Sequence, residues 1–129
     1  YLNQDGTSDY FLSKFQEMMR FAYMRQVFEL TKWAEEMSAL GRDRQKAFFV
    51  FALRMLREYF MMNFNRDSLV YLREYEAEWG ERFAPYINER NVIPFTKEFE
   101  NGFEHISQNG NPKIIFLDTA LRAVRLIKR

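Results

Sequence analysis

Apolar residues recur three and four positions apart along most of the chain, which is the spacing of one face of an α-helix. The alternation of apolar and polar residues that is typical of strands is nearly absent. The pattern predicts a first helix capped by Ser8 or Asp9 and a second helix that ends at Leu40, with Gly41 as the stop. Because the second apolar stripe lies about 110° around from the first, we expect a break near residues 23–26. The residues expected to face inward from these two helices are Phe11, Phe15, Met18, Met19, Ala22, Val27, Leu30, Ala34 and Met37.

Two further helices are predicted in the middle of the chain. Residues 43–63 contain the run AFFVFALRML, and a helix that is apolar nearly all round is expected to be enclosed by its neighbours, so we predict that it is the central helix. A fourth helix is predicted over residues 67–79, with Asp67 or Ser68 as its cap. Its inward residues are expected to be Leu69, Leu72, Tyr75 and Trp79, and an acidic cluster on a solvated face is expected to comprise Glu74, Glu76, Glu78 and Glu81.

Asn91 is predicted to cap a fifth helix that has Pro94 in its first turn, where a missing N–H leaves no hydrogen bond unmade. Its inward residues are expected to be Phe95, Phe99, Phe103 and Ile106. Together these elements predict an all-α fold, a single bundle of about six helices, over residues 8–129. Residues 1–7 are expected to be disordered or to form the edge of the chain.

The segment SQNGNPKIIF, residues 107–116, contains an Asn-Gly pair that is typical of tight β-hairpins. The helical spacing on both sides of the pair argues against a hairpin, because a hairpin needs a strand on each side. We predict instead that Asn109 and Gly110 end the fifth helix in the left-handed conformation. Asn111 is then expected to cap the last helix, with Pro112 at its first position.

The last helix has an unusually wide apolar surface. One face carries Ile114, Leu117, Leu121 and Val124, and the adjoining arc carries Phe116, Ala120, Ala123 and Ile127. Either this helix runs centrally through its own bundle, or it meets a second partner, which is another chain or another part of a longer one. On the second interpretation, the predicted subunit interface comprises Ile115, Phe116, Arg122, Arg125, Leu126 and Arg129.

A narrow polar strip completes the surface of the last helix. Its basic residues are Arg122, Arg125, Lys128 and Arg129, and these four against Asp118 leave a local charge of +3. Such a strip suits contact with a phosphate or with an acidic partner. Cations near the C-terminus of a helix also interact favourably with the helix dipole, so the strip has a purely structural explanation as well.

Composition and motifs exclude several classes of protein. The 19 basic and 18 acidic residues nearly cancel, so no overall field attracts nucleic acid or an anionic membrane. The absence of cysteine removes disulfides and thiolate metal sites and fits a reducing compartment. The chain contains no phosphate-binding glycine motif, and no apolar run approaches the roughly 20 residues that span a bilayer.

The one histidine, His105, is predicted to lie on the surface with Glu98 and Asn101. Gly102 stands three positions before it, where a di-iron bundle would need a glutamate, so that enzyme class is excluded. Ser107 is not part of a nucleophile elbow. We therefore expect no catalytic residue, no cofactor and no metal.

The 14 phenylalanines and seven methionines leave one alternative open. Stripes of such residues usually form the core, but they also line pockets for apolar ligands. The alternative function is therefore a small-molecule-binding all-α domain with a Phe/Met-rich apolar pocket.

Two stretches together resemble a known family. They are GRDRQKAFFVFALRMLRE, residues 41–58, and NGNPKIIFLDTALRAVRLIK, residues 109–128, and FQEMMRFAY at 15–23 fits the same pattern. They resemble the C-terminal collar domain of the delta-prime subunits of bacterial DNA polymerase III clamp loaders. The matching residues are Gly41, Arg42, Gln45, Lys46, Arg57, Glu58, Asn109, Asn111, Pro112, Lys113 and Phe116. Gly110 and the heavy use of Phe and Met after Ala47 depart from the family.

The resemblance implies a non-catalytic, cytoplasmic module of a DNA polymerase holoenzyme. In this family a collar domain follows an AAA+-type module and oligomerises with sibling subunits, and the ATP-dependent complex loads a sliding clamp onto primed DNA. A chain that begins at Tyr1 is expected to be a piece of a longer one, with the AAA+-type module upstream. Its expected partners are the other clamp-loader subunits, whereas the clamp and DNA are reached only through the whole complex and no membrane is involved.

Overall fold

The computed structural model describes residues 4–64, 87 and 90–127, and within these ranges the regular secondary structure consists of α-helices joined by turns, without a strand. The prediction of an all-α protein is therefore confirmed. The predicted fourth helix, residues 67–79, lies outside the described residues. The helices that the structure describes are α1 (Gln4–Tyr23), α2 (Val27–Ser38), α3 (Arg42–Phe64), α5 (Val92–Ser107) and α6 (Pro112–Leu126).

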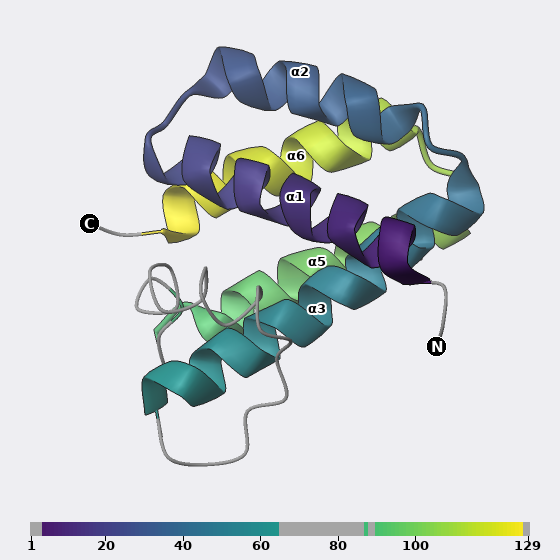
Figure 1. The fold of residues 1–129 in the computed structure, drawn as a ribbon. Coiled ribbons are helices and arrows are strands. Elements are labelled where there is room, and N and C mark those ends of the chain that lie inside the picture. The colour runs from purple at the N-terminus through teal and green to yellow at the C-terminus, as the bar shows by residue number, and fades with distance from the viewer. Residues whose placement is uncertain (1–3, 65–86, 88–89, 128–129) are drawn as a thin grey trace.

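The described helices form two pairs with α1 between them. Figure 1 shows α2 and α6 packed together as one pair and α3 and α5 as the other. The first helix, α1, contacts α2, α6 and α3, and α5 joins the pairs through its contact with α6. Because α6 packs against α1, α2 and α5, neighbours within its own chain account for much of its wide apolar surface.

The first helix is longer than its cap signals predict. We expected Ser8 or Asp9 to cap it, but α1 begins at Gln4. The physical reason is that extending an existing helix by one turn requires no new nucleus, so polar residues without a proline continue it easily. The predicted break near residues 23–26 is confirmed, because α1 ends at Tyr23 and α2 begins at Val27.

The core contains most of the residues that the apolar pattern selected. All five inward residues predicted for α1 are buried, as are Leu30, Ala34 and Met37 of α2. One predicted core residue, Val27, is instead 49% exposed. Trp33, which the pattern did not select, is 2% exposed. The helical period was therefore predicted correctly, whereas the centre of the buried face was displaced on α2. Ile114, on the wide apolar surface of α6, is 65% exposed.

A cluster of aromatic rings joins the two pairs of helices. The ring of Phe116 on α6 stacks on Phe49 of α3, with centroids 4.9 Å apart and planes inclined by 16°. Its other neighbours include Trp33 of α2, with centroids 5.7 Å apart in an edge-on arrangement. A Cβ at Gly102 of α5 would lie 2.6 Å from the Phe49 ring. Gly102 therefore allows α5 to approach α3 closely enough to enclose this cluster.

Candidate interaction surface around the last helix

The turn between α5 and α6 is a Schellman motif. Asn109 adopts a left-handed φ of 66°, and its N–H donates to the carbonyl of Ile106 at 3.0 Å. The N–H of Gly110 donates to the carbonyl of His105 at 2.9 Å, which completes the motif. Of the predicted pair, Asn109 takes the left-handed conformation and Gly110 does not.

Gly110 is required for a different reason, which is close packing. A Cβ at this position would lie 2.9 Å from the carbonyl oxygen of His105 and 2.7 Å from Cδ1 of Ile115. The presence of glycine at position 110 therefore has a local structural explanation. The glycine lets the start of α6 fold back against the end of α5.

The first turn of α6 is capped by a side chain. The Oδ1 atom of Asn111 accepts a hydrogen bond from the backbone N–H of Ile114 at 3.2 Å, and Pro112 occupies the first helical position. This arrangement satisfies one of the backbone donors that the start of a helix leaves unpaired. The turn thus ends one helix and starts the next within a few residues.

Side chains from the start of α3 close the ends of two other helices. Arg42 Nη1 donates to the carbonyl of Ile106 at the end of α5, at 2.7 Å. Gln45 is 1% exposed, and its Nε2 donates at 3.1 Å to the carbonyls of Met37 and Ser38 at the end of α2. The structure thus gives Arg42 and Gln45 an architectural role that the sequence alone did not reveal.

Asn91 closes the end of α6 in the same way. It stands at the N-cap position of α5, as predicted, but its side chain makes no capping bond there. Its Nδ2 atom instead donates to the carbonyl of Leu126 at 3.1 Å. A sequence pattern identifies the helix that follows Asn91 but does not identify the distant carbonyl that its amide reaches.

The residues of the predicted subunit interface are not all on the surface. Ile115 and Phe116 are buried against their own chain, and Leu126 is half-buried. Arg122 and Arg125 are exposed. Arg129 lies outside the described residues. The part of the predicted interface that is open to a partner is therefore the outward strip with Arg122 and Arg125.

The charge of this strip is smaller than the count along α6 suggested. Arg122 Nε lies 3.0 Å from Oδ2 of Asp118 and 3.4 Å from Oε1 of Glu98, which comes from α5. The hydrogen bond and charge of Asp118, together with the charge of Glu98, raise the pKa of Arg122. Arg125 makes no ion pair with a residue in the described ranges. Of the two cations of the strip that the structure describes, Arg122 and Arg125, the second is thus more available to an acidic partner.

A groove of about 300 Å³ runs between α5 and α6 beside this strip. The predicted surface histidine, His105, is exposed and lines it. The side chains and backbone that line the groove belong to Glu98, Asn101, Gly102, His105, Ile114, Ile115, Asp118, Thr119 and Arg122. Among the residues that the structure describes, no group of three His, Cys, Asp or Glu side chains is placed to hold a metal ion.

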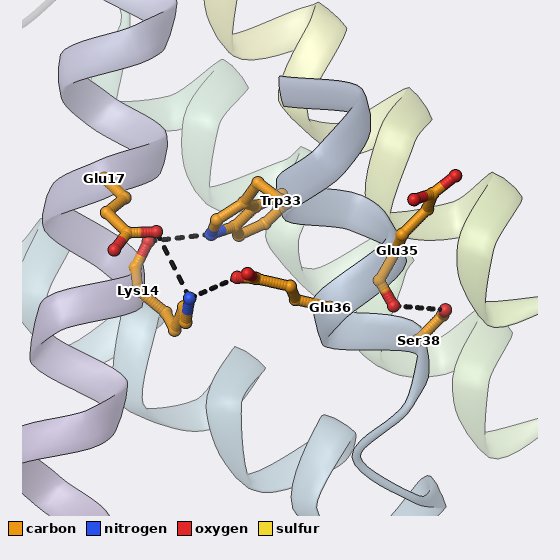
Figure 2. Close-up of polar contacts among 6 residues, drawn as sticks. All are labelled: Lys14, Glu17, Trp33, Glu35, Glu36 and Ser38. Carbon is orange, nitrogen blue, oxygen red and sulfur yellow. Dashed lines mark hydrogen bonds and ion pairs between the residues drawn. The ribbon is translucent and has the colours of Figure 1, made fainter. Parts of the chain in front are cut away.

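A second polar cluster links α1 to α2 (Figure 2). Lys14 Nζ forms ion pairs with Glu36 and, at 3.3 Å, with Glu17, while Trp33 Nε1 donates to the carbonyl of Lys14 at 2.9 Å. Burial lowers the pKa of Lys14, but the hydrogen bonds and charges of Glu36 and Glu17 outweigh it and hold the pKa above its ordinary value of 10.5. The cluster stabilises the contact between two helices and contains no arrangement typical of catalysis.

The Phe/Met-rich interior is packed as core in the part of the chain that the structure describes. Phe15, Met18, Met19 and Met37 are fully buried in one cluster with the other large apolar side chains. A groove of about 360 Å³ between α3 and α5 has a mixed lining, and neither it nor the α5–α6 groove is lined by a methionine. These two grooves therefore do not match the apolar pocket of the alternative function.

None of the described helices combines the length and the apolar character needed to cross a membrane. Comparison of the chain with protein-family models, with curated proteins and with solved structures finds no match.

Proposed function

We propose that this chain is a structural and interaction module of a bacterial DNA polymerase clamp loader, similar to the collar domain of delta-prime subunits. Its function is to oligomerise with sibling subunits, so that the ATP-dependent complex loads the sliding clamp during DNA replication. The module acts in the cytoplasm without a cofactor of its own, and it reaches the clamp and primed DNA through the whole complex. Catalysis in the assembly belongs to other parts.

The observation that carries the proposal is the location of the residues behind the resemblance. Arg42 and Gln45 close the ends of α5 and α2, and Asn111 caps α6. Phe116 stacks on Phe49, so the two resembling segments meet in the core. The resembling residues therefore lie at helix ends and at a core contact, which are positions that determine how helices pack, and this location supports the proposal.

The outward strip of α6 is the surface we propose for subunit contact. Ile115 and Phe116 are covered by their own chain, so assembly would use Arg122, Arg125 and the half-buried Leu126. Because Arg122 already pairs with two carboxylates, Arg125 is the better candidate for an ion pair with a sibling subunit.

The proposal is tested by mixing the chain with the clamp-loader subunits encoded in the same genome. Size-exclusion chromatography with light scattering should show a complex larger than any component. A chain that stays monomeric in the presence of all the subunits would contradict the proposal. Native mass spectrometry on the same sample would favour the alternative function if it revealed a retained apolar ligand.

Two charge reversals locate the contact. Arg125→Glu is expected to weaken assembly, because it places a carboxylate where the partner is proposed to be acidic. Lys97→Glu is the matched control, since Lys97 is exposed on α5 and outside the strip. Equal assembly by the two variants would remove the strip from the interface, and circular dichroism would establish that both remain helical.

A further inference from the structure

The groove between α5 and α6 is rich in hydrogen-bond acceptors. Glu98 and Asp118 contribute carboxylates, Asn101 contributes an amide and Thr119 a hydroxyl. Two carboxylates against the one guanidinium of Arg122 leave a net charge of −1 when His105 is neutral. The field in the groove therefore favours a cation over an anion.

Each carboxylate has an oxygen to spare. Arg122 Nε contacts Oδ2 of Asp118 and Oε1 of Glu98. Asp118 Oδ1 and Glu98 Oε2 make no hydrogen bond or ion pair with any residue in the described part of the chain. An ionised carboxylate accepts at both oxygens, so a second donor can bind without displacing Arg122.

Thr119 adds an unpaired hydroxyl to the groove. Its side chain lines the groove, and the residue is only 4% exposed. Its hydroxyl has no hydrogen-bond partner among the residues that the structure describes. Because Oγ1 is not among the fully buried unpaired atoms of those residues, it remains accessible and can accept a hydrogen bond from a ligand or a water.

The mouth of the groove is partly apolar. Ile114 lines it and is 65% exposed, and Ile115 lies beside it. An aliphatic stem can pack along this surface while a charged head reaches the carboxylates, which is how long basic side chains usually bind. The volume of about 300 Å³ accommodates one such side chain.

We propose that the α5–α6 groove binds the basic side chain, an arginine in preference to a lysine, of a partner protein. The spare oxygens of Glu98 and Asp118 accept from its guanidinium, and the Thr119 hydroxyl accepts a further N–H. Arginine is preferred because its planar head carries five donors in a fixed arrangement, whereas the lysine ammonium is a compact point charge. This inference stands on the groove alone and does not require the partner to be a clamp-loader subunit.

The position of Arg122 makes the proposal distinctive. Its guanidinium already pairs with Glu98 and Asp118, so its positive charge partly neutralises the two carboxylates that would attract an incoming arginine. Arg122→Gln is therefore expected to tighten binding of a basic ligand. Substitutions that remove the acidic groups of the groove are expected to weaken binding of the same ligand.

The test is an NMR titration of the chain with a blocked tripeptide, acetyl-Ala-Arg-Ala-amide. Saturable changes are expected at the backbone amides of Asn101, His105 and Thr119. The comparison peptide replaces arginine by citrulline, which keeps the shape of the side chain but removes its charge, and it should bind about tenfold more weakly. The equivalent lysine peptide should fall between the two.

Variants of the chain assign the effect to the groove. Glu98→Gln combined with Asp118→Asn should weaken binding about tenfold, and Thr119→Val, which keeps the shape but removes the hydroxyl, about threefold. Glu104→Gln is the control, because Glu104 is an exposed acid of α5 that does not line the groove. It should leave binding unchanged. The NMR spectrum of each variant reports whether it is folded.

Three results would overturn the proposal. They are equal binding of the arginine and citrulline peptides, changes that fall outside the groove, and the absence of saturable change at millimolar peptide. Any of them would leave the assembly experiment with the loader subunits unaffected, so failure of this proposal and failure of the proposed function are distinguishable.

Discussion

The two helical turns α1–α2 and α5–α6 have the same backbone geometry but very different residues. In the first, Arg25 adopts a φ of 58°, its N–H donates to the carbonyl of Ala22 at 3.2 Å, and the N–H of Gln26 donates to Phe21 at 2.9 Å. In the second, Asn109 and Gly110 make the equivalent bonds to Ile106 and His105. Both are Schellman motifs.

The difference lies in how well each set of residues suits that geometry. Asparagine enters the left-handed region readily, whereas most residues with a Cβ, arginine included, pay about 1–2 kcal/mol there. Asn111 then caps α6 with its side chain, whereas Gln26 makes no side-chain cap for α2. The α5–α6 turn is therefore favoured locally.

The α1–α2 turn depends more on contacts made away from it. Lys14 pairs with Glu36, and Trp33 Nε1 donates to the carbonyl of Lys14 (Figure 2). These contacts hold the two helices together along their length, so the connecting turn follows from their packing. A chain can thus reach one backbone geometry either through the residues of the turn or through the packing of the helices that it connects.

The largest expected difference in stability between the two turns arises at the last residue of each Schellman motif, which is Gly110 in the α5–α6 turn and Gln26 in the α1–α2 turn. Gly110→Ala should lower the free energy of unfolding by about 2 kcal/mol, because the added Cβ meets Ile115 and the carbonyl of His105. Gln26→Ala, at the equivalent exposed position, should change stability little. Urea denaturation measures both, and similar effects at the two sites would refute the contrast.

Removing the hydrogen bond from Arg42 of α3 to the end of α5 should have the next largest effect on stability. Arg42→Met keeps an aliphatic stem but removes the bond to the carbonyl of Ile106, so it should destabilise the chain by about 1.5 kcal/mol. Arg44→Met is the control, since Arg44 is exposed and its guanidinium lies over the ring of Tyr10, 5.8 Å from the centroid, and not at the end of α5. Equal unfolding midpoints for these variants would exclude an energetic role for Arg42.

The caps of α6 and α2 should respond in opposite directions. Asn111→Ala removes the bond to the N–H of Ile114 and should destabilise the chain by about 1 kcal/mol. Gln26→Ser introduces a capping hydroxyl before α2 and should stabilise it by about 0.5 kcal/mol. Thermal unfolding followed by circular dichroism would detect both changes. A loss of stability in Gln26→Ser would contradict the interpretation that α2 lacks a side-chain cap at this position.

Replacing the left-handed residue of each turn by glycine should also change the stability differently in the two turns, but by a smaller amount. Arg25→Gly relieves the backbone strain at φ 58° but adds freedom to the unfolded chain, so the expected net gain is about 0.5 kcal/mol. Asn109→Gly should be close to neutral, because asparagine tolerates that conformation. The contrast fails if the two variants gain equally in denaturation experiments.

The smallest effect is expected from alkaline pH and should be confined to the α1–α2 pair. The folded chain holds the pKa of Lys14 above 10.5. The stabilisation that its ion pairs with Glu36 and Glu17 provide is therefore present at lower pH and is lost as the pH rises through the folded pKa. Lys14→Met should remove this part of the pH dependence. The measurement is the difference in unfolding free energy between wild type and variant from pH 8 upward, and a difference that does not change with pH would contradict it.

Several features of the candidate surface were predictable because they depend on local sequence. Asn111 and Pro112 begin α6 and Asn109 ends α5, since capping involves residues only a few positions apart. The exposure of His105 follows from its position on the polar face of its helix. The pairing of Arg122 with Glu98 was not predictable, because these residues belong to different helices.

The sequence by itself determined the helical class, the break after Tyr23 and the caps of the last helix, because spacing and capping are local properties of the chain. Only the tertiary structure decided which arc of α6 is buried, since that depends on where α1, α2 and α5 lie around it. It likewise decided that Arg42, Gln45 and Asn91 close the ends of other helices. A hydrogen bond between residues of different helices depends on how the helices pack, and helical periodicity does not specify that packing.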